Sequence, residues 1–148
     1  MDKLFRAVLV SMHGTLGPLS RKVFFLDAPD RKEAMLKAKL HFEDELSGNT
    51  RGVGLYVDEV RFYPNAIREI SKNLFHWFPD AEPRNSGNTH NYRLWMIDQM
   101  QNLEKTKEGS VQAAQWIGSI LGFMEAGNWI GREKAEVLLK KDFDGGYI

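Results

Sequence analysis

The sequence predicts an α+β fold: an N-terminal β-β-α-β unit with a small sheet, followed by a C-terminal bundle of three to four helices. In residues 1–63, short apolar stretches end at turn residues, as strands do, and one segment between them has helical spacing. From residue 64 onward, apolar residues recur every three or four positions, which is typical of amphipathic helices. Because 148 residues is the usual size of one domain, we expect a single compact domain with subdomains at about 1–63 and 64–148.

The first two elements are expected to be the strands of a hairpin. Residues 3–12 are apolar in both alternating phases, which is typical of a central strand whose two faces are both covered. Turn residues follow at 13–18, and residues 21–26 have the pattern of a second strand. Strands joined by a loop of this kind pair antiparallel.

A helix and a third strand complete the predicted N-terminal unit. Asp30 and Glu33 have the form of a capping box at the start of the helix. The apolar residues that then recur at helical spacing are Met35, Ala38, Phe42 and Leu46. Residues 53–63 have a strand pattern whose apolar phase shifts near Asp58, which indicates a bulge. The strand–helix–strand order predicts a parallel pairing of the second and third strands.

Four helices are expected after residue 63. Pro64 suits the first turn of the first helix, and Pro79 ends it. A polar loop follows at 79–88, and Thr89 can cap the second helix. Ser110 can cap the third helix in the same way. The expected ranges of the four helices are 64–78, 89–106, 111–126 and 132–141.

The helix at 111–126 carries a ridge of small side chains. Ala114, Gly118, Gly122 and Ala126 follow one another at regular four-residue spacing, and large apolar residues occupy most of the remaining positions. A helix that is apolar nearly all round is buried, and each glycine in a helix interior costs about 1 kcal/mol relative to alanine. We therefore predict that another helix packs closely against this ridge, since only small residues permit such an approach.

The composition argues against several classes of function. The 20 basic and 20 acidic residues balance as 9 and 9 in residues 1–60 and as 11 and 11 in residues 61–148, so no basic arm favours nucleic acid. The chain has no cysteine, which excludes disulfides, thiolate metal sites and thiol nucleophiles. It also has neither a phosphate-binding loop nor a Gly-x-Ser-x-Gly nucleophile elbow. The sequence thus leans away from an enzyme, and we expect no cofactor.

Acidic side chains are the candidates for a metal or catalytic site. Asp27, Asp58 and Glu59 can gather with Asp30 at one end of the sheet if the second and third strands are parallel neighbours. Clustered carboxylates bind divalent ions or act as acid and base. Helix capping by Asp30 and solvated strand ends form the simpler interpretation, and the four histidines have no metal-binding spacing.

Residues 74–78 contain more large apolar surface than one helix face can bury. They read Leu-Phe-His-Trp-Phe, and an amphipathic helix buries only two or three residues of such a run. The simpler interpretation places the excess inside the molecule. The alternative is an exposed patch that docks a partner, because Trp, Tyr and Arg are the usual anchors of protein interfaces. The candidate partner-binding residues are Phe75, His76, Trp77, Trp95 and Trp129.

Together these observations favour a small soluble, non-enzymatic protein that acts through protein–protein interaction. The interaction can be regulatory, and the partner can be a second copy in a homodimer. The first alternative is a nucleic-acid-associated accessory protein. The second alternative is a metal- or ligand-dependent enzyme that uses the carboxylates at one end of the sheet. No apolar stretch of twenty residues and no signal-peptide pattern occur, so we expect a cytoplasmic protein without a membrane partner. The residues identify no known family.

Overall fold

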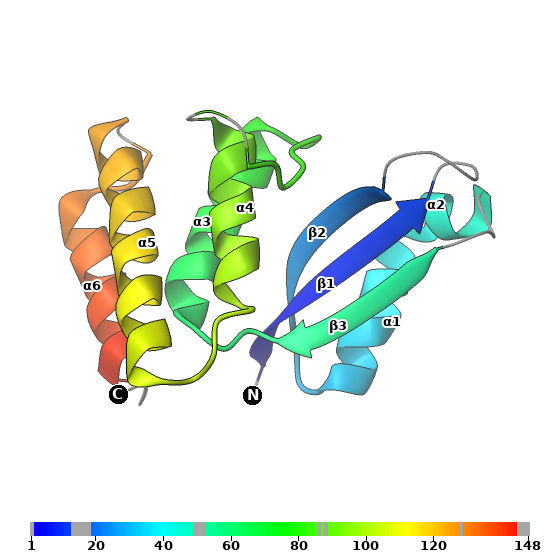
Figure 1. Ribbon diagram of the computed structural model, residues 1–148, viewed down its shortest axis with the longest axis horizontal. Coiled ribbons are helices and arrows are strands. Elements are labelled where there is room, and N and C mark those ends of the chain that lie inside the picture. The colour runs from blue at the N-terminus through cyan, green and yellow to red at the C-terminus, as the bar shows by residue number, and fades with distance from the viewer. Residues whose placement is uncertain are drawn as a thin grey trace. The chain divides into compact units, whose positions relative to one another are not determined.

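The computed structural model describes residues 2–12, 19–48, 53–85, 87, 89–127 and 129–144. The fold is α+β, as predicted, with an antiparallel sheet followed by helices (Figure 1). The chain divides into two compact units, Met1–Glu59 and Val60–Ile148. We call them the sheet unit and the helical unit. The boundary predicted after residue 63 lies close to this division, and the joining of both units into one domain stays a prediction.

The sheet has the strand order β2-β1-β3. Strand β1 (Lys3–Met12) pairs antiparallel with β2 (Leu19–Ala28) and with β3 (Gly54–Glu59). The predicted hairpin and the central position of the first strand are therefore confirmed. The predicted parallel pairing of the second and third strands is wrong, because β1 lies between them. A crossover through a helix makes β2 and β3 parallel, but another strand can still lie between them.

Strand β3 is shorter than the predicted strand at 53–63. Its register with β1 is continuous along its whole length, so the predicted bulge is wrong. The shift in apolar phase instead marks the end of the strand. Beyond it, Phe62 is buried in the helical unit, where the side-chain oxygen of Gln101 accepts hydrogen bonds from the N–H groups of Arg61 and Phe62 at 2.6 and 3.1 Å.

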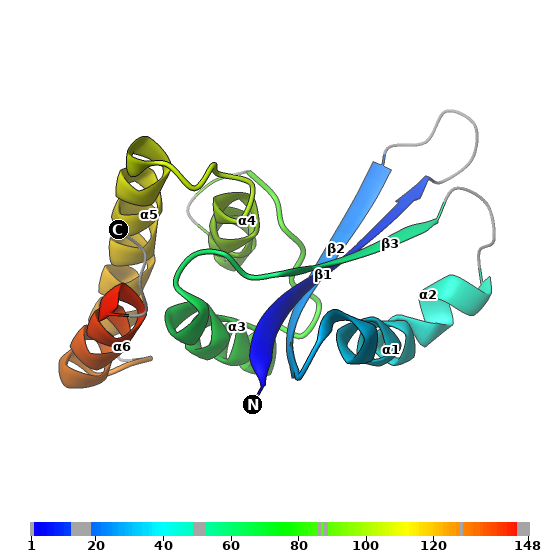
Figure 2. The same cartoon turned by 90° about the horizontal axis from the view of Figure 1, so that it is seen from below.

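Two helices of the sheet unit lie along one side of the sheet (Figure 2). These are α1 (Arg31–His41) and α2 (Glu43–Gly48), and α1 contacts all three strands. The sequence predicts one continuous helix here, whereas the structure breaks it at Phe42, whose φ of −99° and ψ of 24° leave the helical range. Asp30 caps α1 as predicted, since its carboxylate accepts from the N–H of Glu33 at 2.9 Å.

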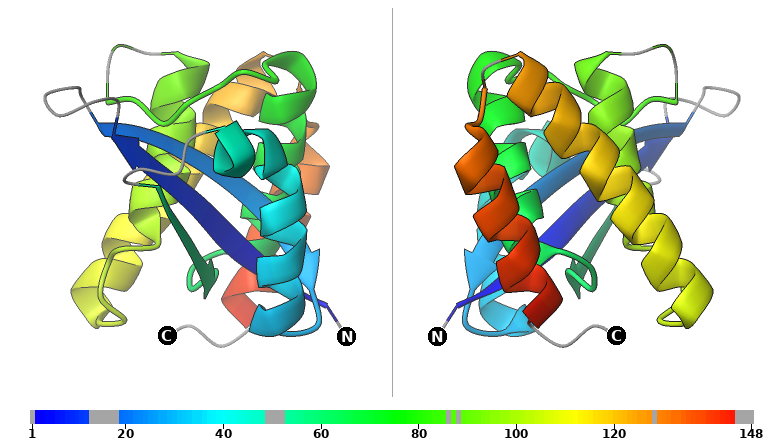
Figure 3. Two further views of the ribbon diagram at one scale, coloured as in Figure 1. Left: turned by 90° about the vertical axis from the view of Figure 1, so that its right-hand side faces the viewer. Right: turned by 90° about the vertical axis from the view of Figure 1, so that its left-hand side faces the viewer.

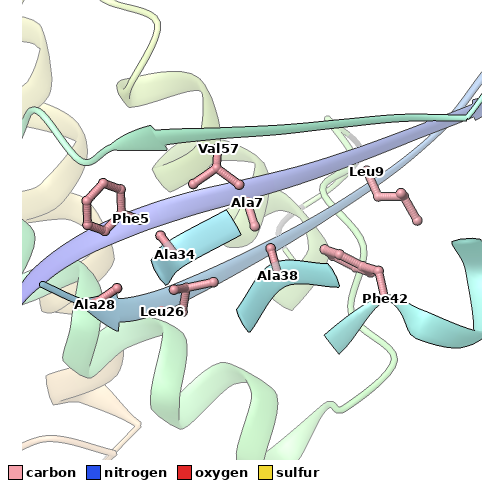
Figure 4. Close-up of a cluster of buried hydrophobic side chains, with 9 residues drawn as sticks. All are labelled: Phe5, Ala7, Leu9, Leu26, Ala28, Ala34, Ala38, Phe42 and Val57. Carbon is pink, nitrogen blue, oxygen red and sulfur yellow. The ribbon is translucent and has the colours of Figure 1, made fainter. Parts of the chain in front are cut away.

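The core of the sheet unit lies between α1 and the sheet (Figure 4). Small alanines on the helix let it approach the strands closely, and aromatic rings close the two ends of the cluster. The buried side chains are Phe5, Ala7, Leu9, Leu26, Ala28, Ala34, Ala38, Phe42 and Val57. Burial of this apolar area stabilises the unit, at about 25 cal/mol for each Å² removed from water.

The helical unit contains four helices at the predicted places, but the second ends at Met100 and not at about residue 106. They are α3 (Pro64–Trp77), α4 (His90–Met100), α5 (Lys107–Ala126) and α6 (Arg132–Asp144). Helix α3 packs against α4 and α6, and α5 also packs against both. Figure 3 (right) shows α5 and α6 close together at their connection and diverging from it. The side chains with at most 1% exposure are Ile67, Ile70, Leu74, Leu94, Ile97, Met100, Ile117, Ile120 and Met124, among others.

Threonines cap two of these helices. Thr89 accepts from the N–H of Tyr92 at 3.3 Å, which confirms the predicted start of α4. Thr106 accepts from the N–H of Gly109 at 3.1 Å, so α5 begins earlier than the predicted cap at Ser110. Both threonines satisfy a backbone donor that has no partner within its helix.

Candidate partner-binding surface

The aromatic run at the end of α3 is divided between core and surface. Leu74 is buried, Phe75 and Phe78 are half-buried, and His76 is exposed. Trp77 is 62% exposed. A helix that buried the whole run would need neighbours on every side, and α3 has them only on part of its surface. The surplus apolar area predicted from the sequence therefore lies partly on the outside of the helical unit.

Four rings meet where three helices end. Phe78, at the end of α3, stacks on His90, at the start of α4, with ring centroids 3.9 Å apart. Trp129 lies 6.0 Å from Phe78 and 6.0 Å from Phe123, which belongs to the last turns of α5. We call this cluster the aromatic end. Figure 1 shows the three helix ends on the same side of the helical unit.

A buried arginine supports the aromatic end from within. The guanidinium carbon of Arg93 lies 3.1 Å from the centre of the Phe123 ring, and the guanidinium donates to the carbonyl oxygen of Thr89 at 2.8 Å. Arg93 is only 5% exposed, and burial lowers its pKa. A desolvated cation–π contact is worth about 2 kcal/mol, so Arg93 holds Phe123 in place although the ring itself is partly exposed.

The remaining aromatic candidate belongs to a second group. Trp95 of α4 lies 5.8 Å from Tyr92 and 6.0 Å from Trp116 of α5. All three side chains are half-buried. Of the predicted partner-binding residues, Trp129 thus lies in the aromatic end, Phe75, His76 and Trp77 lie on the adjoining end of α3, and Trp95 lies in the second group.

The predicted carboxylate site loses its geometric basis. Its convergence required neighbouring second and third strands, and β1 separates them. Asp58 instead accepts two hydrogen bonds from Arg6, at 3.0 and 3.1 Å, and Glu59 lies 3.7 Å from the ammonium of Lys3. The carbonyl oxygen of Asp27 accepts from Lys37. Among the described residues, no three His, Asp or Glu side chains are grouped to hold a metal ion. His13 lies outside those residues.

The small-residue ridge of α5 is exposed. Ala114, Gly118, Gly122 and Ala126 are all exposed, and a Cβ placed on either glycine would meet no atom within 4 Å. The predicted close packing of another helix of this chain is therefore wrong. The reason is that the larger side chains on the opposite face offer more apolar area to the core. The buried residues of α5 are Gly109, Ala113, Ile117, Ile120, Leu121 and Met124.

An open hollow of about 370 Å³ lies beside this ridge, between α5 and α6. Helices α5 and α6, which both line it, diverge from their connection (Figure 3, right). Its lining is mostly apolar, with one lysine and one tyrosine. The lining residues are Tyr63, Ala114, Ile117, Gly118, Leu139 and Lys140. The sequence pattern predicts helix packing for Ala114 and Gly118 and does not indicate the other four residues.

The backbone of Tyr63 is left-handed, with φ and ψ both 52°, and it is the only described non-glycine residue with positive φ. Its side chain does not cap α3. The buried carboxylate of Asp142 does so, accepting from the N–H and side-chain amide of Asn65 and from the N–H of Ala66 at 2.8–2.9 Å. Gln101 holds the residues before Tyr63. Burial and the nearby charge of Asp142 raise the pKa of Tyr63.

Comparison with known proteins adds no functional assignment. No protein-family model matches the chain, and neither a curated protein nor a solved structure matches it. Among the described residues, none of the helices has the length and hydropathy that a membrane crossing requires. The function is therefore inferred from the surfaces of the molecule.

Proposed function

We propose that the protein acts by binding another protein through Trp77 and the adjoining aromatic end of its helical unit. The exposure of Trp77 is the observation that carries this proposal. A tryptophan offers about 150–250 Å² of surface for burial, and 62% of this one remains in water. Buried tryptophans are among the strongest anchors of protein interfaces, so covering Trp77 would give a partner a large gain.

The surroundings of Trp77 support an interface. The stacked rings of Phe78 and His90 and the buried Arg93 beneath Phe123 fix the shape of the surface before any partner binds. Preorganised side chains lose little conformational entropy on binding. The chain that follows α3 is polar, and it contains an ion pair between Arg84 and Glu82 at 2.8 Å. An apolar centre beside a polar rim is the usual anatomy of an interface.

Site-specific photo-cross-linking tests this proposal. The photoreactive residue p-benzoylphenylalanine replaces Trp77 in one variant and Leu40 in a control variant. Leu40 is 71% exposed and lies on α1 in the other unit. In cells that produce the protein, we expect a discrete protein adduct from position 77 and none of the same mass from position 40. Identical adducts from both positions, or none from position 77, would contradict the proposal.

Self-association is the form of this proposal in which the partner is a second copy. Light scattering of the wild type and of Trp77→Ala separates the two forms. A doubled mass that returns to the monomer value in Trp77→Ala identifies a homodimer, whereas a monomeric mass in both excludes one. We assign the interaction to the cytoplasm on the sequence pattern alone.

A further inference from the structure

We propose that the hollow between α5 and α6 binds a small amphipathic carboxylate, an apolar chain whose carboxylate pairs with Lys140. The hollow is lined from α5, α6 and the start of α3, whereas Trp77 lies at the other end of α3. The inference is therefore independent of the proposed protein-binding surface.

The shape and lining of the hollow favour an apolar chain. Its volume of about 370 Å³ lies within the range of about 300–1,000 Å³ that is usual for ligand sites. Ala114, Ile117 and Leu139 supply apolar walls. Gly118 leaves the space open, because a Cβ there would meet no other atom within 4 Å. Removing an apolar chain from water is favourable in such a site.

The polar groups at the hollow are donors, which favours an anionic head. In the part of the chain that the structure describes, Lys140 forms no hydrogen bond or ion pair, and the hydroxyl of Tyr63 forms no hydrogen bond. The carboxylate near Tyr63 belongs to Asp142, and its oxygens accept three hydrogen bonds at the start of α3. Its charge still acts on Tyr63, whose pKa it raises, so Lys140 is the group at the hollow that attracts an anion. Lys140 is exposed, so the apolar chain supplies most of the affinity and the lysine supplies selectivity.

The backbone of Tyr63 is a second feature of a binding site. A left-handed non-glycine residue is strained, and such residues cluster at ligand sites because the surrounding structure must hold them. Buried polar side chains hold this one on both sides, Gln101 before it and Asp142 after it. A glycine would adopt this backbone conformation without strain. The surrounding contacts instead hold a tyrosine there, at the wall of the hollow.

Titration of the full chain with decanoate, followed by amide NMR shifts below the micelle concentration, tests the site. In the wild type we expect shifts confined to the residues around the hollow. A Cβ at Gly118 enters open space, so Gly118→Leu places a side chain at the hollow, and we expect it to weaken decanoate binding at least about tenfold. Gly122→Leu is the matched control, since this glycine lies one turn further along the ridge, is equally open and does not line the hollow. Leucine is a better helix former than glycine, so both variants keep the fold.

Lys140→Gln and the neutral probe decanol test the charge. We expect Lys140→Gln to weaken decanoate binding about twofold to fivefold and to leave decanol binding unchanged. Shifts spread over the whole chain, an equal loss in Gly118→Leu and Gly122→Leu, or an equal response of both probes to Lys140→Gln would each overturn the proposal. A dimer by light scattering that Gly118→Leu dissociates would overturn it as well, because a second copy would then fill the hollow.

Discussion

Two ion pairs of the sheet unit show how burial decides the importance of a single residue. The side chain of Arg6 is 9% exposed in its pair with Asp58, whereas Lys3 and Glu59 are both more than half exposed. We expect Asp58→Ala to lower the free energy of unfolding by about 1–3 kcal/mol, because it removes two hydrogen bonds from a buried guanidinium. Glu59→Ala is the control, with an expected loss below about 0.5 kcal/mol. Urea unfolding measures both, and equal losses would refute the distinction.

Asp142 is the side chain whose removal we expect to affect the helical unit most directly. Asp142→Ala leaves the N–H groups of Asn65 and Ala66 without their acceptor and lowers the free energy of unfolding by about 2 kcal/mol. Asp142→Asn keeps one acceptor oxygen and is expected to lose less. The control is Glu136→Ala on the exposed face of α6, expected to change stability by less than about 0.5 kcal/mol. Thermal unfolding ranks the stabilities of the three variants. An Asp142→Ala variant as stable as the wild type would show that water replaces the carboxylate as acceptor.

We expect His41 to make the stability of the sheet unit depend on pH. Its ring stacks on Phe24 at 3.6 Å, and burial lowers its pKa from 6.5, while Glu45 raises it and Lys22 lowers it further. The unfolded chain therefore binds a proton at a higher pH than the folded chain, so stability falls as the pH drops through about 6.5. We expect a lower urea midpoint at about pH 5.5 than at about pH 7.5, with a smaller difference in His41→Gln. The same difference in both proteins would assign the effect to other groups.

At the level of elements, the glycines of α5 differ in what surrounds them. Gly118→Ala and Gly122→Ala each add a Cβ into open space, so we expect each to stabilise the protein by about 0.5–1 kcal/mol through helix propensity. Gly109→Ala is the contrasting variant, because its Cβ would collide with the carbonyl oxygen of Glu104. We expect it to destabilise the protein. The three unfolding midpoints measure this difference, and a loss in Gly118→Ala would reveal a neighbour that packs on the ridge.

The elements themselves follow from sequence patterns, but their partners do not. Apolar periodicity predicts the three strands and the helices because burial is the main driving force for both. The same periodicity does not predict whether the ridge of α5 is packed against another helix or exposed, since a small residue fits equally well in a close contact and on an open surface. It also placed the start of α5 at Ser110 instead of Thr106, because both residues are good caps.

The hollow illustrates what a sequence pattern cannot contain. Tyr63 precedes a proline, which favours extended backbone, so nothing local predicts its left-handed conformation. That conformation depends on Asp142 and Gln101, which lie far along the chain. The sequence leaves two alternatives for Trp77, a position inside the molecule or one on an exposed patch, because a single helix face cannot bury five consecutive large residues. Which ring is exposed depends on the neighbouring helices.

At the scale of the whole molecule, the helical unit contains the core residues expected of a domain that folds alone. Helices α3, α4 and α5 supply the buried residues Ile70, Ile97, Ile117 and Met124, and Ala135 of α6 is also buried. We therefore expect residues 60–148, produced alone, to show a helical circular dichroism spectrum and one cooperative thermal transition. A gradual loss of signal on heating would contradict this. The Asp142→Ala variant of the same fragment is the control, with a lower transition temperature.

The first turn of α3 depends on a residue that the ribosome makes much later. Asn65 and its acceptor Asp142 are 77 residues apart. At about 5–20 residues per second, synthesis of the intervening chain takes roughly 4–15 s. Strand β3 is complete at Glu59, so the sheet unit can form during that interval. The cap on α3 needs Asp142, so we expect the sheet unit to fold before the helical unit is complete.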